Sequence, residues 1–319
     1  MDQLRSLRVF AQVIAEGSFA GAARTLDLAP AVVTRAVSDL EDHLGVRLLN
    51  RTTRRLALTE IGEDYLERAR RVLRELDDAD AIAISVNSAP SGNIRILSPP
   101  AFAAHQLVQH LPDFRKRYPS IQLELSASGP VAAADENFDV SILSIGQQPL
   151  QGDFVVRQLA SSSFVICAAP AYLERCGRPQ LPNDLLLHDG LLPAVAAVRR
   201  ELTLFREETG TAKGTRQTLN LALRPPALFT SQLELLYAAA VAGMGVAGLP
   251  TFMVADALRE GRLERVLPDW RGGTLQLYAA MPTRKHVPTR TRVFMDFLIE
   301  IFGGTQDDPW ANAIGSIGK

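Results

Sequence analysis

Lysine and cysteine are both scarce in this chain. Only four of its 34 basic residues are lysines, which we attribute to a genomic composition bias rather than to chemistry. The formal net charge is −1, so a surface that is basic all over is excluded, and any contact with nucleic acid must come from a local patch. The two cysteines, Cys167 and Cys176, are too few for a disulfide framework, which indicates a reducing compartment. Cys167 lies in an apolar run and is predicted to be buried.

Targeting and membrane segments are also missing from the pattern. The sequence does not open on a cationic stretch followed by an apolar core, so no secretory signal is predicted. Residues 235–255 are uncharged and nearly long enough to span a bilayer, but glycines and Pro250 divide them. We therefore expect this run to be buried core, and the protein to be cytoplasmic with no membrane partner.

Catalytic, metal and cofactor motifs are lacking as well. His105 and His110 lie five positions apart, so they do not share a helical face as a zinc-binding pair would. No G-x-S-x-G elbow and no local Ser/His/Asp arrangement is present. Residues 243–248 match G-x-G-x-x-G, but the predicted order is helix, glycine turn, strand, which is the reverse of a dinucleotide site. We predict a protein that is not an enzyme and that holds no metal and no cofactor.

What the sequence does contain is a distinctive stretch at residues 18–55, which reads as two short helices, a tight turn and an arginine-bearing wing. Ser18 is a suitable N-cap for the first helix. Residues 27–29 are long enough only for a turn, and Pro30 suits the first turn of the second helix. The buried stripe of that helix is predicted to consist of Val33, Val37, Leu40 and Leu44.

The opposite face of the second helix carries small or hydrogen-bonding side chains and one long cation. This composition suits a helix pressed into a DNA major groove, although periodicity alone would favour an ordinary surface helix. No acidic residue occurs between Asp42 and Glu60, and residues 51–55 combine cations with hydroxyls. These features favour phosphate contacts and insertion into the minor groove.

The region 10–62 resembles the winged helix-turn-helix of LysR-type transcriptional regulators. The resemblance is carried by SFAGAARTL, the proline-led helix, the LE-x-x-LG-x-x-L run and the ending NRTTRR–LTE-x-G. It implies that Arg54 enters the minor groove. With the helix face described above, it nominates as DNA contacts Ser18, Pro30, Ala31, Thr34, Arg35, Ser38, Arg51, Thr52 and Arg54. Members of the family often read L-S-P-S where this chain has residues 28–31, LAPA, so the contacts of two serines are absent.

A long helix is predicted after the wing. Thr59 is a suitable N-cap, and apolar residues from Ala69 to Val86 recur at alternating spacings of three and four. This heptad pattern predicts pairing with a second copy of the chain. The alternative is a single helix packed on its own domain. We favour the dimer, because a dyad DNA site needs two heads.

Beyond a hinge at residues 87–92, strands and helices alternate, which predicts an α/β fold with parallel sheets. A helix over residues 232–242 is expected to be capped by Ser231. The segments PAYL, GMGVAGLP and MPTRKH-x-P resemble the LysR effector domain. That resemblance implies two α/β lobes joined by crossover strands, like a periplasmic binding protein, with a small-molecule cleft between the lobes.

The predicted fold is therefore multidomain, with an all-α winged helix-turn-helix head and a long linker helix before an α/β two-lobed effector domain. The predicted boundaries are 1–58 for the DNA-binding domain, 59–87 for the dimerisation helix, 91–302 for the effector domain (lobe I about 91–160 and 269–302, lobe II about 161–268) and 303–319 for a flexible tail.

Effector-binding residues are nominated only by their placement. Ligands of open α/β sheets lie at the carboxyl ends of strands, near helix N-termini. This criterion selects Ser98, Pro100, Ser144, Thr230, Ser231, Gly245 and Val246. For each single Ser or Thr, a cap or turn is the simpler explanation. Family members often carry an arginine where this chain has Leu143, so one possible partner for an anionic ligand is missing.

The function predicted from the sequence is a cytoplasmic, sequence-specific transcriptional regulator that binds dyad sites in double-stranded promoter DNA. The resemblance implies a small-molecule effector, dimers that assemble into a tetramer, and RNA polymerase as a further candidate partner. Two alternatives stay open: an architectural DNA-binding repressor without a ligand, and a cytoplasmic solute-binding protein.

Overall fold

The computed structural model describes residues 2–51, 56–84, 89–129, 131–146, 150, 152–194, 201–207, 216–222, 224–282, 287–311 and 314. The chain divides into two compact units, Met1–Ser88 and Ala89–Lys319, which we call the head unit and the regulatory unit. Each is described by itself.

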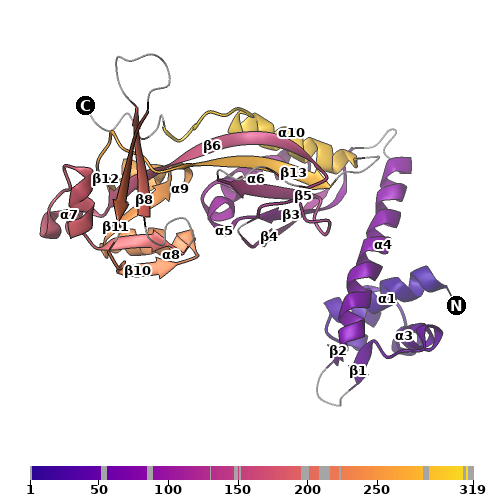
Figure 1. Cartoon of the computed structure of the whole chain (residues 1–319). Coiled ribbons are helices and arrows are strands. Elements are labelled where there is room, and N and C mark those ends of the chain that lie inside the picture. Colours follow the sequence, from indigo (N-terminus) through magenta and orange to yellow (C-terminus); the bar gives the residue numbers. More distant parts are fainter. Residues whose placement is uncertain are drawn as a thin grey trace. The chain divides into compact units, whose positions relative to one another are not determined.

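The head unit is helical apart from one small hairpin (Figure 1). Its elements are α1 (Gln3–Ala15), α2 (Phe19–Thr25), α3 (Pro30–Leu44), β1 (Leu49–Arg51), β2 (Leu56–Leu58) and α4 (Glu60–Ile84). Strands β1 and β2 pair antiparallel. Phe10, Val13, Val33, Val37 and Leu40 have no exposed surface, so the predicted buried stripe of α3 forms the centre of this core.

Local signals fix the helix ends of the head as predicted. Pro30 occupies the first turn of α3, and the helix ends at Gly45, which has a left-handed conformation. Asp27 also adopts a positive φ, 52°, in the turn between α2 and α3. The Thr59 hydroxyl accepts the Gly62 amide at the start of α4, which confirms the predicted cap. The short connection keeps α2 and α3 packed together.

Helix α4 contributes to the head core only along its first turns. Leu66 and Ala69 are buried there, whereas Val72 is 50% exposed and Ala79 is exposed. Ala69, which opens the predicted heptad pattern, therefore packs inside its own head. Within the heptad pattern, the first exposed apolar residue is Val72.

The regulatory unit is built on one large mixed sheet. Its first elements are β3 (Gly92–Ser98), α5 (Pro100–Phe102), the π-helical turn η1 (Ala103–Leu107), α6 (Val108–Arg117), β4 (Ile121–Ala127), β5 (Val140–Ile145), β6 (Phe154–Ala168) and α7 (Pro170–Cys176). The chain continues with the 3-10 turn η2 (Pro182–Leu187), β7 (Gly190–Pro193), β8 (Glu201–Glu207), β9 (Arg216–Ala222), β10 (Leu228–Thr230) and α8 (Leu233–Val241). It ends with β11 (Val246–Pro250), α9 (Thr251–Arg259), β12 (Glu264–Arg265), β13 (Thr274–Pro282) and α10 (Thr289–Phe302).

Two lobes share this sheet, whose order is β10-β7-β11-β6-β13-β5-β3-β4. We call β3, β4, β5, α5, η1, α6 and α10 the first lobe, and β7, β10, β11 and α7–α9 the second lobe. Strand β6 passes between them: it pairs with β13 over residues 154–163 and with β11 from Phe164 onward. Figure 1 shows β6 and β13 side by side between the two groups of elements.

The prediction of purely parallel sheets is wrong. Strands β3, β4 and β5 are parallel to one another, as are β7, β10 and β11, but β6 and β13 run antiparallel to their neighbours. Each lobe alone follows the α/β rule. The antiparallel strands are those that join the lobes, as the resemblance implied.

One further prediction for the second lobe needs correction. Gln232, not Ser231, is the N-cap residue of α8, and it makes no side-chain cap; the Thr230 hydroxyl accepts the Gln232 amide instead. The apolar run that contains Cys167 is the end of the 15-residue strand β6. The β8–β9 ribbon was not predicted.

The residues beyond α10 that the structure describes are packed rather than free. Gly304 donates its amide to the Leu159 carbonyl, and Trp310 lies against Phe252 and Phe302 with ring centroids 5.9 and 6.2 Å away. The expectation of a flexible tail does not hold for residues 303–311.

Residues 235–255, considered above as a membrane span, comprise most of α8, the strand β11 and the start of α9. No helix in the described part of the chain is long and apolar enough to cross a bilayer.

Candidate functional site

The exposed face of α3 carries the side chains predicted to read DNA. Ala31, Thr34 and Arg35 are exposed, opposite the buried Val33 and Val37. The Arg35 side chain is 84% exposed, and its Nε lies 3.9 Å from the Asp39 carboxylate, a surface contact of small energy. The guanidinium is therefore accessible to a nucleic acid.

Two hydroxyls of the predicted DNA set already make local bonds. The Ser18 hydroxyl accepts the Gly21 amide at 3.0 Å, which caps α2. The Thr34 hydroxyl donates to the Pro30 carbonyl at 3.0 Å, so its oxygen keeps acceptor capacity. Pro30 and Ser18 are exposed, and Ser38 is half-buried.

The wing hairpin is anchored to α3 by one buried carboxylate. Glu41 is 4% exposed, and its Oε1 accepts the amides of Leu48 and Leu49 at 2.9 and 3.0 Å. Its Oε2 lies 3.4 Å from the exposed Arg47 guanidinium. Because Glu41 belongs to the recognition helix, it links the position of the wing to that of the helix. The family motif contains this glutamate, but its role was not predicted.

The start of α4 holds the same segment from the other side. The Thr59 hydroxyl lies 2.8 Å from the Arg47 carbonyl, and the Thr59 amide donates to the Leu48 carbonyl at 3.0 Å. A Cβ on Gly62 would lie 2.1 Å from the Leu48 carbonyl oxygen, so only glycine fits there. Arg51 ends β1, while Thr52 and Arg54 lie outside the described residues.

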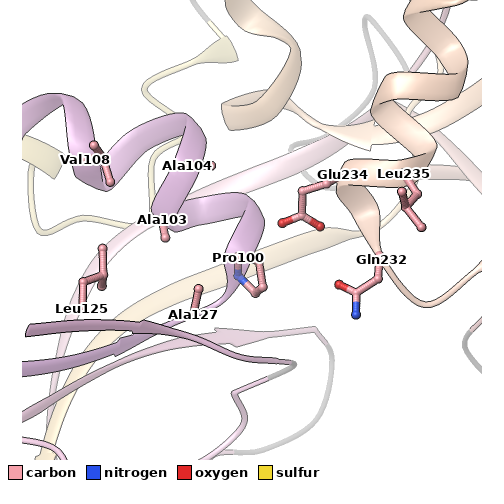
Figure 2. A pocket seen from close by; sticks show the side chains of 9 residues that line it. All are labelled: Pro100, Ala103, Ala104, Val108, Leu125, Ala127, Gln232, Glu234 and Leu235. Atoms are coloured by element: carbon pink, nitrogen blue, oxygen red, sulfur yellow. The ribbon is translucent and has the colours of Figure 1, made fainter. Parts of the chain in front are cut away.

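An open groove of about 580 Å³ lies between the two lobes of the regulatory unit (Figure 2). Its first-lobe side comes from α5, η1, α6 and β4, and its second-lobe side comes from the first turn of α8 and the residue before it. The lining residues are Pro100, Ala103, Ala104, Val108, Leu125, Ala127, Gln232, Glu234 and Leu235.

Among the described residues, Glu234 is the only charged one that lines this groove. Its Oε1 is buried and has no hydrogen-bond partner among the described residues. In Figure 2 its carboxylate points across the groove from α8 toward Ala103 and Pro100. Beside it, His105 packs edge-on against Tyr237 with centroids 4.9 Å apart. Burial lowers the pKa of His105, an effect that the charge of Glu234 opposes. The groove thus offers mostly apolar walls, the Glu234 carboxylate and the side-chain amide of Gln232.

The predicted effector residues are distributed over several environments. Pro100 lines the groove, and Ser231 immediately precedes its Gln232. Ser98 is fully buried, and its hydroxyl donates to the Pro99 carbonyl at 3.2 Å. Ser144 lies within β5, Thr230 ends β10, Val246 is in the core, and Leu143 is fully buried.

The glycine turn before β11 packs against protein rather than opening a loop. A Cβ on Gly245 would lie 2.2 Å from the Asp189 carbonyl oxygen. The hydroxyl of the buried Tyr172 accepts the Asp189 amide at 2.8 Å, and Arg175 donates to the Gly243 carbonyl at 3.1 Å. The order of α8, glycine turn and β11 is the one predicted, so these glycines serve close packing.

Within the described residues, no group of three or more His, Cys, Asp or Glu side chains could hold a metal ion. Cys167 is buried, and this burial raises the pKa of its thiol to about 12. Cys176 is exposed, and both cysteines are free.

A winged helix-turn-helix unit and a two-lobed α/β unit in one chain define a class of transcriptional regulator. The first unit has the geometry of a DNA-reading head, and the second that of a ligand-responsive domain.

Comparison with known proteins assigns the family. Residues 4–63 match the model "Bacterial regulatory helix-turn-helix protein, lysR family", and residues 87–303 match "LysR substrate binding domain". The HTH-type transcriptional regulator CrgA of Neisseria meningitidis serogroup C is 34% identical over 299 residues, which cover 93% of this chain and 96% of CrgA.

Solved structures support the same family assignment. The structure of CrgA, a LysR-type transcriptional regulator from Neisseria meningitidis, has a TM-score of 0.57 at 32% identity and covers 94% of this chain and 98% of CrgA. The full-length Vibrio cholerae virulence activator AphB has a TM-score of 0.60 at 26% identity, covering 94% and 99% of the two chains. This chain belongs to the LysR family of transcriptional regulators. It therefore combines a DNA-binding helix-turn-helix with an effector-binding domain, and the solute-binding alternative does not apply.

Proposed function

We propose that this regulator binds a dyad promoter site in double-stranded DNA through the exposed face of α3. One observation carries this proposal: Arg35 extends from that face with 84% of its side chain exposed, while Val33, Val37 and Leu40 on the other side are fully buried. The small Ala31 beside it permits close approach to the groove floor. Pro30, Thr34 and Ser38 complete the reading face, with Ser18, Arg51 and Thr52 at phosphates and Arg54 in the minor groove.

The test is a gel-shift assay with promoter DNA and a nonspecific competitor. Arg35→Ala should weaken specific binding about ten- to a hundredfold, the cost of losing a base contact. Arg115→Ala removes the same charge from an exposed position of α6 in the regulatory unit, and should bind like the parent. Arg54→Ala should weaken binding most at A/T-rich flanks. Parent-like binding by both Arg35→Ala and Arg54→Ala would refute the placement.

A second copy of the chain is the proposed partner of α4. Val72 and Ala79 leave apolar surface on this helix beyond the head core, and a dyad site requires two heads. Family members form oligomers, and we propose a dimer that assembles into a tetramer on DNA. The proposal also places the protein in the cytoplasm, with RNA polymerase as a partner at the promoter.

We propose the inter-lobe groove as the effector site. Its walls are apolar except for Gln232 and Glu234, and Glu234 supplies an unpaired acceptor. This lining suits a small, largely apolar molecule with a hydrogen-bond donor. Ser98, Ser144, Thr230, Ser231, Gly245 and Val246 remain predicted effector residues, although none of them is among the described residues that line the groove.

Thermal shift of the full chain against a metabolite panel tests the effector site. A binder should raise the melting temperature of the parent and not that of Leu235→Glu, which places a charge on the groove wall. Gln217→Glu, on the exposed face of β9, is the matched control and should respond like the parent. A panel without binders would favour the architectural repressor instead.

A further inference from the structure

The segment after α10, residues 304–311, lies at the point where β6 passes from one lobe to the other. Strand β11 occupies one edge of β6 only from Phe164 onward. Before that point, residues 304–311 satisfy the same edge: the Leu159 carbonyl accepts the Gly304 amide at 3.0 Å, and the Ser161 amide donates to the Asp307 carbonyl at 2.8 Å. An unpaired buried edge would be costly, so this pairing fixes the segment to the crossover.

Asp308 joins this crossover to the second lobe. One of its carboxylate oxygens accepts the Ser163 amide of β6 at 2.8 Å. The carboxylate also accepts the hydroxyl of Thr251, the first residue of α9, at 2.9 Å. Thr251 is 1% exposed and lies 2.7 Å from the Ser162 hydroxyl. The Thr251 and Ser162 hydroxyls are thus buried, Asp308 is half-buried, and the network has a charged acceptor, the stronger kind of hydrogen bond.

Trp310 extends the link to the first lobe. Its Nε1 donates to the Gln106 side chain at 2.8 Å, and Gln106 in turn donates to the Phe252 carbonyl of α9 at 2.6 Å. Gln106 lies in the π-helical turn η1, whose Ala103 and Ala104 line the groove. A π-turn changes which side chains face inward, and such turns recur at functional sites.

We propose that residues 304–311 form a strap that sets the resting angle between the two lobes and thereby regulates the effector groove. The strap holds the crossover strand, α9 of the second lobe and η1 of the first lobe at once. Asp308 fixes the strap to β6 and α9, and Trp310 bonds to Gln106 of the first lobe, so a rotation of the lobes about β6 must stretch this chain of bonds. This inference rests on the proposed function only in assigning the regulated groove; the mechanical link is independent of it.

The test measures the distance between the lobes in the full chain by pulsed electron paramagnetic resonance. One spin label is attached to the native Cys176 on α7, which is exposed, and the other to Arg115→Cys on α6. Cys167 is buried and stays unlabelled. Dilution with unlabelled Cys176→Ser chains removes distances between copies. The labelled parent should give one narrow distance distribution.

Asp308→Ala should broaden this distribution, and amide exchange at Ser161 and Ser163 should accelerate about tenfold or more, because hydrogen bonds to a charged group are lost. Asp307→Ala is the matched control. The Asp307 side chain is exposed and, within the described part of the chain, bonds to the nearby Thr305 hydroxyl, so this variant should behave like the parent. Equal broadening in both variants would overturn the proposal, as would a parent-like Asp308→Ala.

If Asp308→Ala does not fold, the same distance measurement on Trp310→Phe tests the strap. This variant keeps an aromatic ring in this position, and it removes the N–H donor to Gln106 together with part of the indole ring. A broadened distribution supports the strap, and a parent-like one overturns it. These measurements need neither DNA nor effector. A strap that controls the lobes in a protein with no effector response would therefore contradict the proposed groove function and leave the strap intact.

Discussion

Glu41→Ala should loosen the wing of the DNA-binding head without disturbing the regulatory unit. The carboxylate is 4% exposed and accepts two consecutive amides, those of Leu48 and Leu49. Alanine leaves both amides buried without this acceptor. The root of the hairpin would then be free to shift relative to α3 and its exposed face.

The loss of stability in Glu41→Ala can be estimated from the two hydrogen bonds that Glu41 accepts. Each hydrogen bond to a charged group contributes about 1.5–3 kcal/mol, and a buried unsatisfied amide costs about 1–3 kcal/mol. Partial entry of water reduces the sum, so we expect Glu41→Ala to lower the free energy of unfolding by about 3–5 kcal/mol, as for other buried charged partners. Glu41→Gln keeps an acceptor oxygen and should cost about 1–2 kcal/mol. Asp42→Ala, a change at the exposed neighbouring acid, should be nearly neutral.

Hydrogen exchange at Leu48 and Leu49 is the assay. Both tryptophans of the chain, Trp270 and Trp310, lie in the regulatory unit, so their fluorescence should show that this unit is unchanged. Exchange at the two amides should accelerate strongly in Glu41→Ala, moderately in Glu41→Gln and not in Asp42→Ala. Promoter affinity should fall in the same order. Unchanged protection in Glu41→Ala would refute the anchoring role.

Three further predictions concern the regulatory unit. Burial lowers the pKa of His105 below its unfolded value of about 6.5. The free energy of unfolding should therefore be highest above about pH 6.5 and should fall as the pH drops from there toward the folded pKa. His105→Asn should reduce this fall, measured by urea unfolding followed by tryptophan fluorescence. Gly245→Ala should lower the free energy of unfolding by about 1–3 kcal/mol in the same assay. Gly248→Ala, whose Cβ would meet nothing within 4 Å, should leave packing intact. Equal effects of the two variants would contradict the close contact of Gly245 with the Asp189 carbonyl. A thiol reagent should modify Cys176 in the native protein and Cys167 only after unfolding; rapid labelling of both would show that Cys167 is accessible.

Much of the head could be predicted from its sequence. Val33, Val37 and Leu40 recur at helical spacing, Ser18 and Thr59 are caps, and Pro30 begins a helix, all through interactions within a few residues. The role of Glu41 was missed because its amide partners lie seven and eight positions away on another element.

In the regulatory unit, the sequence by itself determined most helices and strands and the two-lobed family pattern, since apolar periodicity and turn residues are local signals. Only the tertiary structure decided the antiparallel crossover, the groove beside Glu234 and the packing of Asp308 and Trp310. Gln106 and the Phe252 carbonyl are 146 positions apart, and such contacts depend on how the lobes pack, which no periodicity along the chain records. A polar segment containing glycine and proline resembles a free tail in sequence, yet here it satisfies the open edge of a strand, because the free energy of unpaired buried amides is set by the folded surroundings and not by composition.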